Sequence, residues 1–175
     1  SGLSLDASTK DEIALSWTKE DSSSDGTWEV YRSEDGGLGS IVATIADVST
    51  TSYTDAPLDD GEEYFYTVRR VTDHTSADSA QQSATTTLPA PTDPSLTPGS
   101  REIALSWTVN ADDGTQTVEF KRSSDSTWTE WESGLSLATA SETITGLDDG
   151  EEYDVRVVAV NDAAAPSSVG TTTLP

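Results

Sequence analysis

The chain has 175 residues and is strongly acidic, with 32 Asp and Glu residues against 9 Lys and Arg residues and a net charge of −23. It contains no cysteine, which excludes disulfides and thiolate metal sites. The charge argues against nucleic acid and anionic membrane as partners, and the longest apolar runs, 41–46 and 157–160, are too short for membrane insertion.

The first half of the chain is predicted to consist of short β-strands. Ile13, Leu15 and Trp17 alternate with small or polar residues, and a second alternating run includes Tyr64 and Tyr66. Alternation with a period of two over short segments, separated by turns rich in Gly, Asp and Ser, indicates half-buried antiparallel strands. No segment combines a 3.6-residue period with helix caps, so we expect an all-β fold.

Residues 89–94 are predicted to be a linker. Pro89-Ala-Pro-Thr-Asp-Pro94 has three prolines in six residues, which disfavours helix and stiffens the chain toward polyproline II. We therefore expect a first domain at 1–88, a short semi-rigid linker at 89–94 and a second domain at 95–175. Because the chain begins at Ser1 rather than at a methionine, we expect a processed or excised segment.

The second half repeats the first. Residues 12–18 recur as 102–108 with an offset of 90, and 27–33 match 117–123 at the same offset. Residues 58–64 recur as 147–153, and 85–89 recur as 171–175. This alignment places Val118 where the first copy has Trp28. It also places Ala159 opposite Arg70, so we expect that strand end to be exposed in the first copy. A period this long indicates a duplicated domain rather than a solenoid.

These repeated motifs resemble the fibronectin type III family. The resemblance covers nearly the whole chain and implies an all-β fold of two tandem seven-stranded Greek-key β-sandwiches, which are immunoglobulin-like. It implies that Trp17 and Trp107 are central core residues. It also implies that a Leu-x-x-Gly-x-x-Tyr motif forms the corner before the sixth strand in each copy, where the Tyr hydroxyl bonds the backbone upstream. The motif residues are Leu58, Gly61 and Tyr64 in copy one and Leu147, Gly150 and Tyr153 in copy two.

The acidic residues are spread over both halves. Residues 1–88 carry 17 acidic and 5 basic residues, a net charge of −12, and residues 89–175 carry 15 and 4, a net charge of −11. Such charge repels itself in dilute buffer, whereas molar salt shortens the screening length to about 3 Å. The pattern resembles proteins of salt-loving archaea or their viruses. An ordinary acidic extracellular module is the alternative.

Catalysis has little support in the sequence. The only histidine, His74, lies in a loop of copy one and has no counterpart in copy two. The acidic turns 59–63 and 148–152 could attract Ca²⁺ or Mg²⁺, but they lack the ligand spacing of a calcium loop, and a solvated turn is the favoured reading. We expect no cofactor, no metal and no enzymatic activity.

Tryptophans are the candidate partner-binding residues. Trp128 and Trp131 lie three residues apart in a predicted strand at 127–132, so strict alternation places them on opposite faces, one packed and one exposed. Lateral packing over the sheet is the favoured reading, and an exposed tryptophan that stacks on a sugar or anchors a protein partner is the alternative. Trp28 is a second candidate, because the alignment gives copy two a valine at that position.

The composition and the resemblance together predict a non-catalytic structural or interaction module. We expect it in an extracellular, cell-surface or virion assembly in high salt, with protein partners. The first alternative is a receptor- or glycan-binding adhesion module, which needs exposed aromatic residues. The second is an accessory domain of a larger secreted hydrolase. These functional expectations depend on analogy between folds rather than on a defined site.

Overall fold

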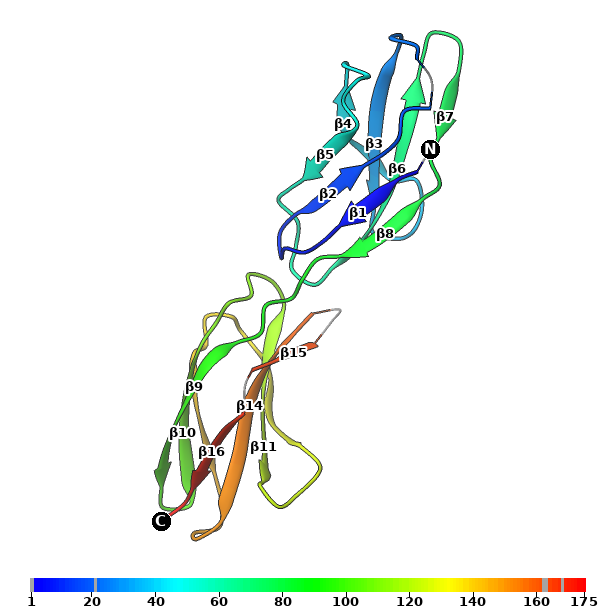
Figure 1. Cartoon of the computed structure of the whole chain (residues 1–175). Coiled ribbons are helices and arrows are strands. Elements are labelled where there is room, and N and C mark those ends of the chain that lie inside the picture. Colours follow the sequence, from blue (N-terminus) through cyan, green and yellow to red (C-terminus); the bar gives the residue numbers. More distant parts are fainter. Residues whose placement is uncertain (1, 21, 162–163, 168) are drawn as a thin grey trace. The chain divides into compact units, whose positions relative to one another are not determined.

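The computed structural model describes residues 2–20, 22–161, 164–167 and 169–175, and these residues form strands and no helix. Consequently no helix in the described part of the chain is long and apolar enough to cross a membrane. The chain divides into two compact units, Ser1–Thr87 and Leu88–Pro175. Each unit is an antiparallel sandwich (Figure 1).

The first unit consists of a three-stranded and a five-stranded sheet. The smaller sheet has the order β1-β2-β5, with β1 (Ser4–Asp6), β2 (Ile13–Ser16) and β5 (Ser52–Asp55). The larger has the order β4-β3-β6-β7, with β4 (Ser40–Ile45), β3 (Thr27–Ser33), β6 (Glu63–Val71) and β7 (Ser76–Asp78). In addition, β8 (Gln82–Thr85) pairs with β6, so β7 and β8 are two segments of one last strand.

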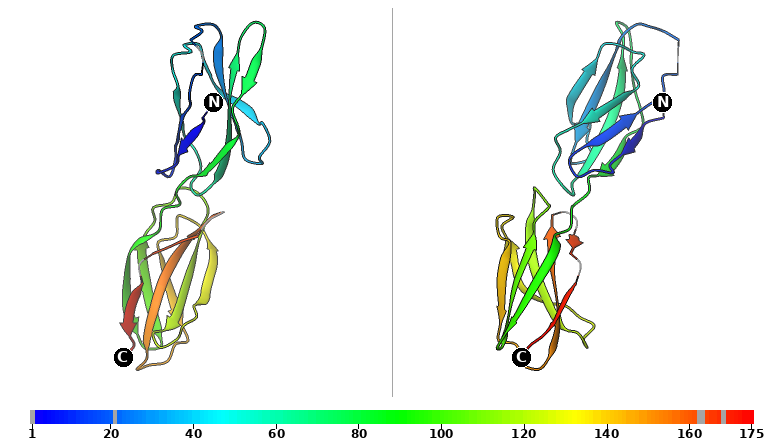
Figure 2. Two further views of the ribbon diagram at one scale, coloured as in Figure 1. Left: turned by 45° about the vertical axis from the view of Figure 1, so that its right-hand side comes forward. Right: turned by 60° about the vertical axis from the view of Figure 1, so that its left-hand side comes forward.

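The second unit repeats this arrangement (Figure 2). Its smaller sheet has the order β13-β10-β9, with β13 (Ser141–Thr145), β10 (Glu102–Thr108) and β9 (Thr92–Gly99). Its larger sheet has the order β12-β11-β14-β15, with β12 (Thr129–Leu135), β11 (Thr115–Arg122), β14 (Glu152–Val160) and β15 (Ala164–Pro166), and β16 (Gly170–Thr173) also pairs with β14. The prediction of two tandem all-β sandwiches is confirmed.

Alternation along the strands builds the two cores. In β2 the burial alternates residue by residue, and Ile13 and Leu15 are buried while their neighbours are exposed. Ile103 and Leu105 are buried in the same way in β10. Fully burying an aliphatic side chain contributes about 1.5–3 kcal/mol, so these strands hold the two sheets of each unit together.

The segment expected to be a linker, 89–94, partly belongs to the second sandwich. β9 begins at Thr92, and the side-chain amide of Asn110 donates to the Ala90 carbonyl at 2.8 Å and to the Thr92 hydroxyl at 3.2 Å. β9 is the edge strand of its sheet, where Pro94 removes no required ladder hydrogen bond. Pro94 therefore does not interrupt the strand. The prolines had indicated a linker up to residue 94, so the start of the second domain was predicted at 95, after β9 had already begun.

The third strands of the two copies align with an offset of 88, not 90. Trp28 pairs with Arg70 in unit one, and Gln116 pairs with Ala159 in unit two, so Gln116 rather than Val118 occupies the position of Trp28. Gly26 and Gly114 mark the same point 88 residues apart. Their φ angles are 94° and 91°, and an added Cβ would lie 2.1 Å from the Val71 carbonyl oxygen and 2.3 Å from that of Val160. An alignment error of two residues leaves every side chain on the same face of its strand. The alternation of buried and exposed residues therefore could not reveal that the offset is 88 rather than 90.

The two cores differ most at one connected set of positions. In unit one, the Asp55 carboxylate accepts hydrogen bonds from the Arg32 guanidinium at 3.0 Å and from the Tyr66 hydroxyl at 2.9 Å. Burial and the adjacent Asp55 carboxylate raise the pKa of Tyr66. The strand registers place three apolar residues at the corresponding positions of unit two, namely Phe120, Ile144 and Val155. We call Arg32, Asp55 and Tyr66 the buried triad, in which the Arg32 side chain remains 29% exposed.

Candidate functional site

The outer face of the five-stranded sheet in unit two carries a tryptophan that contacts two cations. Trp128 directly precedes β12 and is half-buried. The Arg156 guanidinium lies 4.3 Å from the centroid of its ring, and the Lys121 ammonium nitrogen lies 5.4 Å from it. Both distances are within the range of cation–π attraction. We call Trp128, Lys121, Arg156 and Glu119 the Trp128 platform.

Alternation along β11 and β14 places these charged side chains on the outer face. Val118 and Val157 are buried, so their neighbours Glu119 and Arg156 point to the opposite side of the sheet. Glu119 and Arg156 are direct cross-strand partners, and the guanidinium donates to the Glu119 carboxylate at 2.6 Å. This bond helps to hold the guanidinium over the indole ring.

A second ion pair lies beside the platform on the same face. Lys121 and Asp154 are also cross-strand partners, with 3.0 Å between the ammonium nitrogen and the carboxylate. Partial burial acts to raise the pKa of Asp154, but hydrogen bonds from Lys121, Ser123 and Thr171 outweigh it and hold that pKa below its ordinary value. The carboxylate is therefore ionised and fixed at neutral pH.

Trp131 lies on the other side of the same sheet. It is partly buried and packs against the core of unit two, and its ring meets that of Phe120 edge to face, with 6.3 Å between centroids and 73° between planes. Trp128 and Trp131 thus occupy opposite faces. Of these two candidates, the outer face presents Trp128.

Trp28, the further candidate for partner binding, is buried in the core of unit one. Trp28 is 5% exposed, and its ring meets that of Trp17 edge to face, with 5.8 Å between the centroids. Its indole N–H donates to the Val48 carbonyl at 3.2 Å. The expected exposure of Arg70 is wrong, because that residue is 9% exposed and its guanidinium lies 5.0 Å from the centroid of the Trp28 ring. Trp28 and Arg70 therefore shield each other from solvent. A comparison of the two copies one position at a time could not show this, because the burial depends on both residues together.

The residues of the Leu-x-x-Gly-x-x-Tyr motifs form the turns before β6 and β14. The Tyr64 hydroxyl accepts from the Asp59 backbone N–H at 3.1 Å, and the Tyr153 hydroxyl accepts from that of Asp148 at 3.2 Å. Gly61 and Gly150 have φ angles of 72° and 79°, which favour glycine. The two leucines, Leu58 and Leu147, are buried, as are Trp17 and Trp107.

The acidic turns do not assemble a metal site. In unit two, the Asp148 carboxylate accepts from Arg122, and the Asp149 carboxylate accepts from the Arg101 backbone N–H at 2.7 Å. Within residues 2–20, 22–161, 164–167 and 169–175, no group of three or more His, Asp or Glu side chains is placed to hold a metal ion. These carboxylates instead fix the turn in which they lie.

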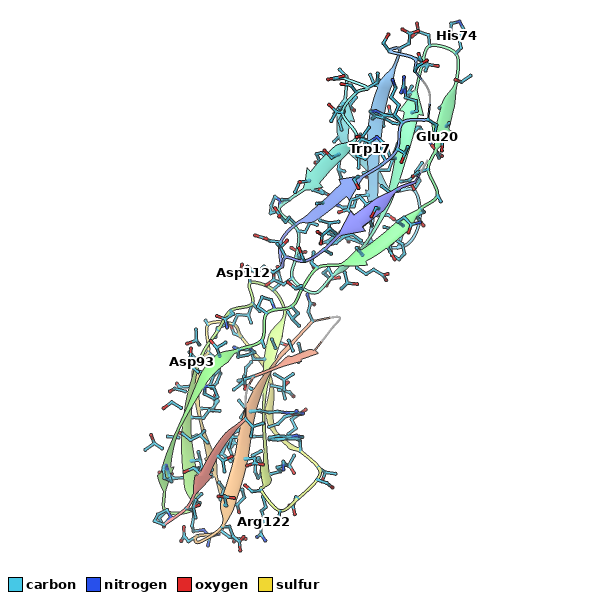
Figure 3. All side chains as sticks on the ribbon, in the orientation of Figure 1. Trp17, Glu20, His74, Asp93, Asp112 and Arg122 are labelled. Atoms are coloured by element: carbon cyan, nitrogen blue, oxygen red, sulfur yellow. The ribbon has the colours of Figure 1, made fainter. Side chains whose placement is uncertain are left out.

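His74 lies at the tip of the turn between β6 and β7 and is exposed (Figure 3). Its backbone N–H donates to the Thr72 hydroxyl at 3.4 Å. A shallow polar hollow includes His74 together with Asp25 and Asp73. General acid–base work needs a positioned partner for the imidazole, and the described contacts of His74 are those of a turn residue.

Three residues of the outer faces escaped sequence reasoning. In unit two, Arg156 and Lys121 flank Trp128. In unit one, the Arg69 guanidinium lies 4.8 Å from the centroid of the Tyr31 ring. A signal was present, because unit two has only four basic residues and two of them alternate outward opposite acidic residues. This pairing of basic with acidic residues can be recognised only when the register between β11 and β14 is known.

Comparison with known proteins identifies the fold. No family model and no curated protein matches the chain. A solved two-domain fibronectin type III segment from chicken tenascin matches with a TM-score of 0.73 and 17% sequence identity, over 98% of this chain and 97% of that chain. The FN1-FN3 domains of chicken CNTN1 match with a TM-score of 0.44 and 16% identity, over 100% of this chain and 67% of that chain. The second score is too low to support an argument. The first shows that the chain shares the fold of two tandem fibronectin type III sandwiches, which is the fold that the motifs predicted.

Proposed function

We propose that this chain is a non-catalytic attachment module, which binds a protein partner through the Trp128 platform in an extracellular or virion surface assembly at high salt. The observation that carries the proposal is the Trp128 ring, fixed by Arg156 at 4.3 Å on the outer face of the larger sheet. Trp and Arg are the residue types that contribute most to binding energy at protein interfaces. A side chain that is already ordered loses less conformational entropy on binding.

The charge of the chain supports the high-salt setting. A net charge of −23 repels itself in dilute buffer and is screened in molar salt. Under such screening, long-range charge steering is weak while burial of apolar surface is favoured, so an aromatic anchor is a better basis for attachment than an ion pair. The fibronectin type III-like fold is compatible with this role, since such sandwiches offer sheet faces and loop tips rather than deep catalytic pockets.

Site-specific photo-crosslinking tests the proposal. Benzoylphenylalanine replaces Thr127, the exposed neighbour of Trp128, in one variant and Thr143, which is exposed on β13 of the other sheet, in a matched control. Both are irradiated in molar KCl with the surface fraction, cell envelope or virion, of the organism that makes the protein. We expect a discrete protein adduct from position 127 and none from position 143. Equal adducts from the two positions, or none from position 127, would contradict the proposal.

A glycan is the competing ligand for the same indole, because sugar rings stack on tryptophan. A glycan array probed in molar KCl separates the two. Binding of the chain to a defined set of sugars, lost in Trp128→Ala, would replace the protein partner by a carbohydrate.

A further inference from the structure

One edge of the larger sheet in unit one is a strand that is paired on one side only. β4 pairs with β3 and, among the described strands, with no other (Figure 1). The backbone hydrogen bonds of the described residues include none that reaches 40–46 from outside this ladder. An edge strand presents a row of unpaired backbone N–H and C=O groups, which can pair with a strand of another chain.

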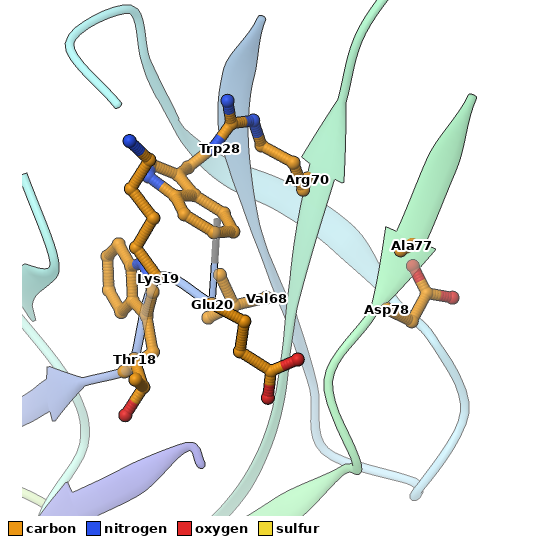
Figure 4. Close-up of a pocket in the computed structure, with 9 residues that line it drawn as sticks. Thr18, Lys19, Glu20, Trp28, Val68, Arg70, Ala77 and Asp78 are labelled. Carbon is orange, nitrogen blue, oxygen red and sulfur yellow. The ribbon is translucent and has the colours of Figure 1, made fainter. Parts of the chain in front are cut away.

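β4 is held in place on its inner side. Ile45 lies opposite Trp28 in the register and packs against the core of unit one, as does Ala43. Trp28 is in turn covered by the guanidinium of Arg70, which lies 5.0 Å from the centroid of its ring (Figure 4). The edge is therefore a preformed strand, and a partner loses little conformational entropy in ordering it.

Two exposed aliphatic side chains accompany this edge. Ile41 is 49% exposed and lies opposite Tyr31 in the register, and Leu38, just before β4, is 41% exposed. Among the residues that the structure describes, Val169 is the one other large hydrophobic residue with comparable exposure. In strand addition, backbone hydrogen bonds provide the affinity and side chains along the strand provide further contacts. The beginning of β4 offers both.

The edge is also uncharged, whereas its counterpart in unit two is not. No charged residue occurs between Asp35 and Asp47, although the chain has a net charge of −23. β12 is the edge strand at the same place in unit two, and it exposes Glu130 and Glu132. The register of β12 against β11 shifts twice, and that of β4 against β3 shifts once. Charges and bulges on an edge strand oppose pairing with another chain, so β12 is protected more strongly than β4.

We propose that β4 pairs antiparallel with β4 of a second copy of this chain, so that the two larger sheets become continuous. A contact across a two-fold axis presents the same residues from both sides. The second copy therefore brings an uncharged strand with an exposed Ile41 to an edge of the same character. Two chains of net charge −23 repel each other, but this contact joins segments without charge, and molar salt screens the remainder. The contact lies in unit one and is independent of the Trp128 platform.

Sedimentation equilibrium of the full chain in molar KCl, over a series of concentrations, tests the proposal. We expect the average mass to rise from the monomer value of 18.5 kDa toward twice that value. The mass should rise no further, because pairing uses the free β4 edge of both copies. A mass that stays at the monomer value, or that grows without limit, would overturn the proposal.

A lysine on the edge provides a matched pair of variants. Thr44 is exposed on β4 opposite Glu29, so Thr44→Lys gains a carboxylate across the strands, and circular dichroism should show that unit one still folds. Because lysine on an edge strand blocks strand addition, we expect the dissociation constant of the dimer to rise about tenfold or more. Ser133→Lys adds the same charge to exposed β12 and should leave the dimer unchanged. Equal effects of the two substitutions, or none from Thr44→Lys, would overturn the proposal.

Hydrogen exchange of the wild-type chain locates the contact without any substitution. We expect backbone amides of β4 to exchange more slowly as the protein concentration rises, while those of β12 exchange at a constant rate. Protection that appears with concentration at β12 and not at β4 would mean that the copies meet elsewhere, and the proposal would then be wrong.

Discussion

The indole N–H of Trp107 donates to the side-chain oxygen of Gln116 across 2.6 Å in the interior of the second unit. Gln116 is fully buried and also donates to two backbone carbonyls, those of Ser136 and Thr139. One side chain therefore connects β10, β11 and the loop that follows β12. Such a network is rigid when complete and costly when broken.

Gln116→Ala is expected to lower the free energy of unfolding of unit two by about 3 kcal/mol, because it leaves the buried Trp107 indole N–H without an acceptor and a cavity where the fully buried side chain was. Urea denaturation in molar KCl, followed by tryptophan fluorescence, measures the loss. Gln82→Ala, at an exposed position of β8, is the matched control and should change stability by no more than about 0.5 kcal/mol. Equal effects of the two substitutions would contradict the role given to Gln116.

The buried triad should respond differently to one substitution than to three. Asp55 is 4% exposed, and Asp55→Ala leaves the Arg32 charge without its partner, at an expected cost of about 3–5 kcal/mol. Replacing all three residues by those of unit two, as R32F/D55I/Y66V, should restore stability to the wild-type value or exceed it by about 1–4 kcal/mol. The same urea titration applies. The triad is needed for more than charge balance if the triple variant is as unstable as Asp55→Ala.

Asp154 should make unit two sensitive to acid in a defined direction. Because its pKa in the folded state lies below the unfolded value of about 3.9, its contribution to stability is complete above that pH and disappears as pH falls through the folded pKa. The Asp154→Asn variant lacks this pH-dependent contribution to the free energy of unfolding. The difference in unfolding free energy between wild type and variant should therefore be constant at neutral pH and shrink below about pH 4. A difference that persists unchanged in acid would show that Asp154 acts through shape alone.

Salt should stabilise the whole chain. Screening of 23 net negative charges in molar KCl relieves repulsion that favours the unfolded state. We expect the melting temperature to rise substantially between dilute buffer and molar KCl, as measured by circular dichroism. A melting temperature independent of salt would remove the argument for a high-salt setting.

Substitutions of Trp128, which precedes β12, and of Trp131, which lies within it, should separate effects on binding from effects on stability. Trp131→Ala removes a ring that packs on the core and should destabilise unit two, whereas Trp128→Ala should leave folding nearly intact and weaken assembly. His74→Ala should change neither. The measurements are urea denaturation and recovery of the chain in its surface assembly. Intact assembly with Trp128→Ala would place the contact surface elsewhere.

Sequence reasoning predicted the sandwiches because their signals are local. The alternation around Trp17 and Trp107 and the two tyrosine motifs each lie within a few residues, so strand type and fold class could be read directly. Register is different, since shifting a strand by two residues conserves every local rule. That is why Gln116 was not matched with Trp28. Arg70 was correctly matched with Ala159, but its burial depends on its contact with the Trp28 ring, which the alignment does not contain.

The candidate site could be predicted only in part for a related reason. The separation of Trp128 and Trp131 by three residues correctly implied opposite faces, but it could not say which face is the core. That choice depends on Phe120 and on Arg156, which reaches Trp128 from another strand. The sequence also could not show that nitrogens of Trp17 and Arg70 lack acceptors, because folding decides which donors are paired.

The contrast between the buried triad and its apolar counterpart has a consequence for how the chain assembles itself. Tandem domains of similar sequence are prone to exchange strands while they fold. If β3 entered the second sandwich in place of β11, Arg32 would be buried against Ile144 and Val155 with no acceptor for its charge. If β11 entered the first, Phe120 would face the carboxylate of Asp55, which would keep its hydrogen bond from Tyr66 but lose the cation that balances its charge. Each core is thus complementary to its own strand and not to the corresponding strand of the other unit. Two similar domains on one chain can therefore fold without exchanging strands.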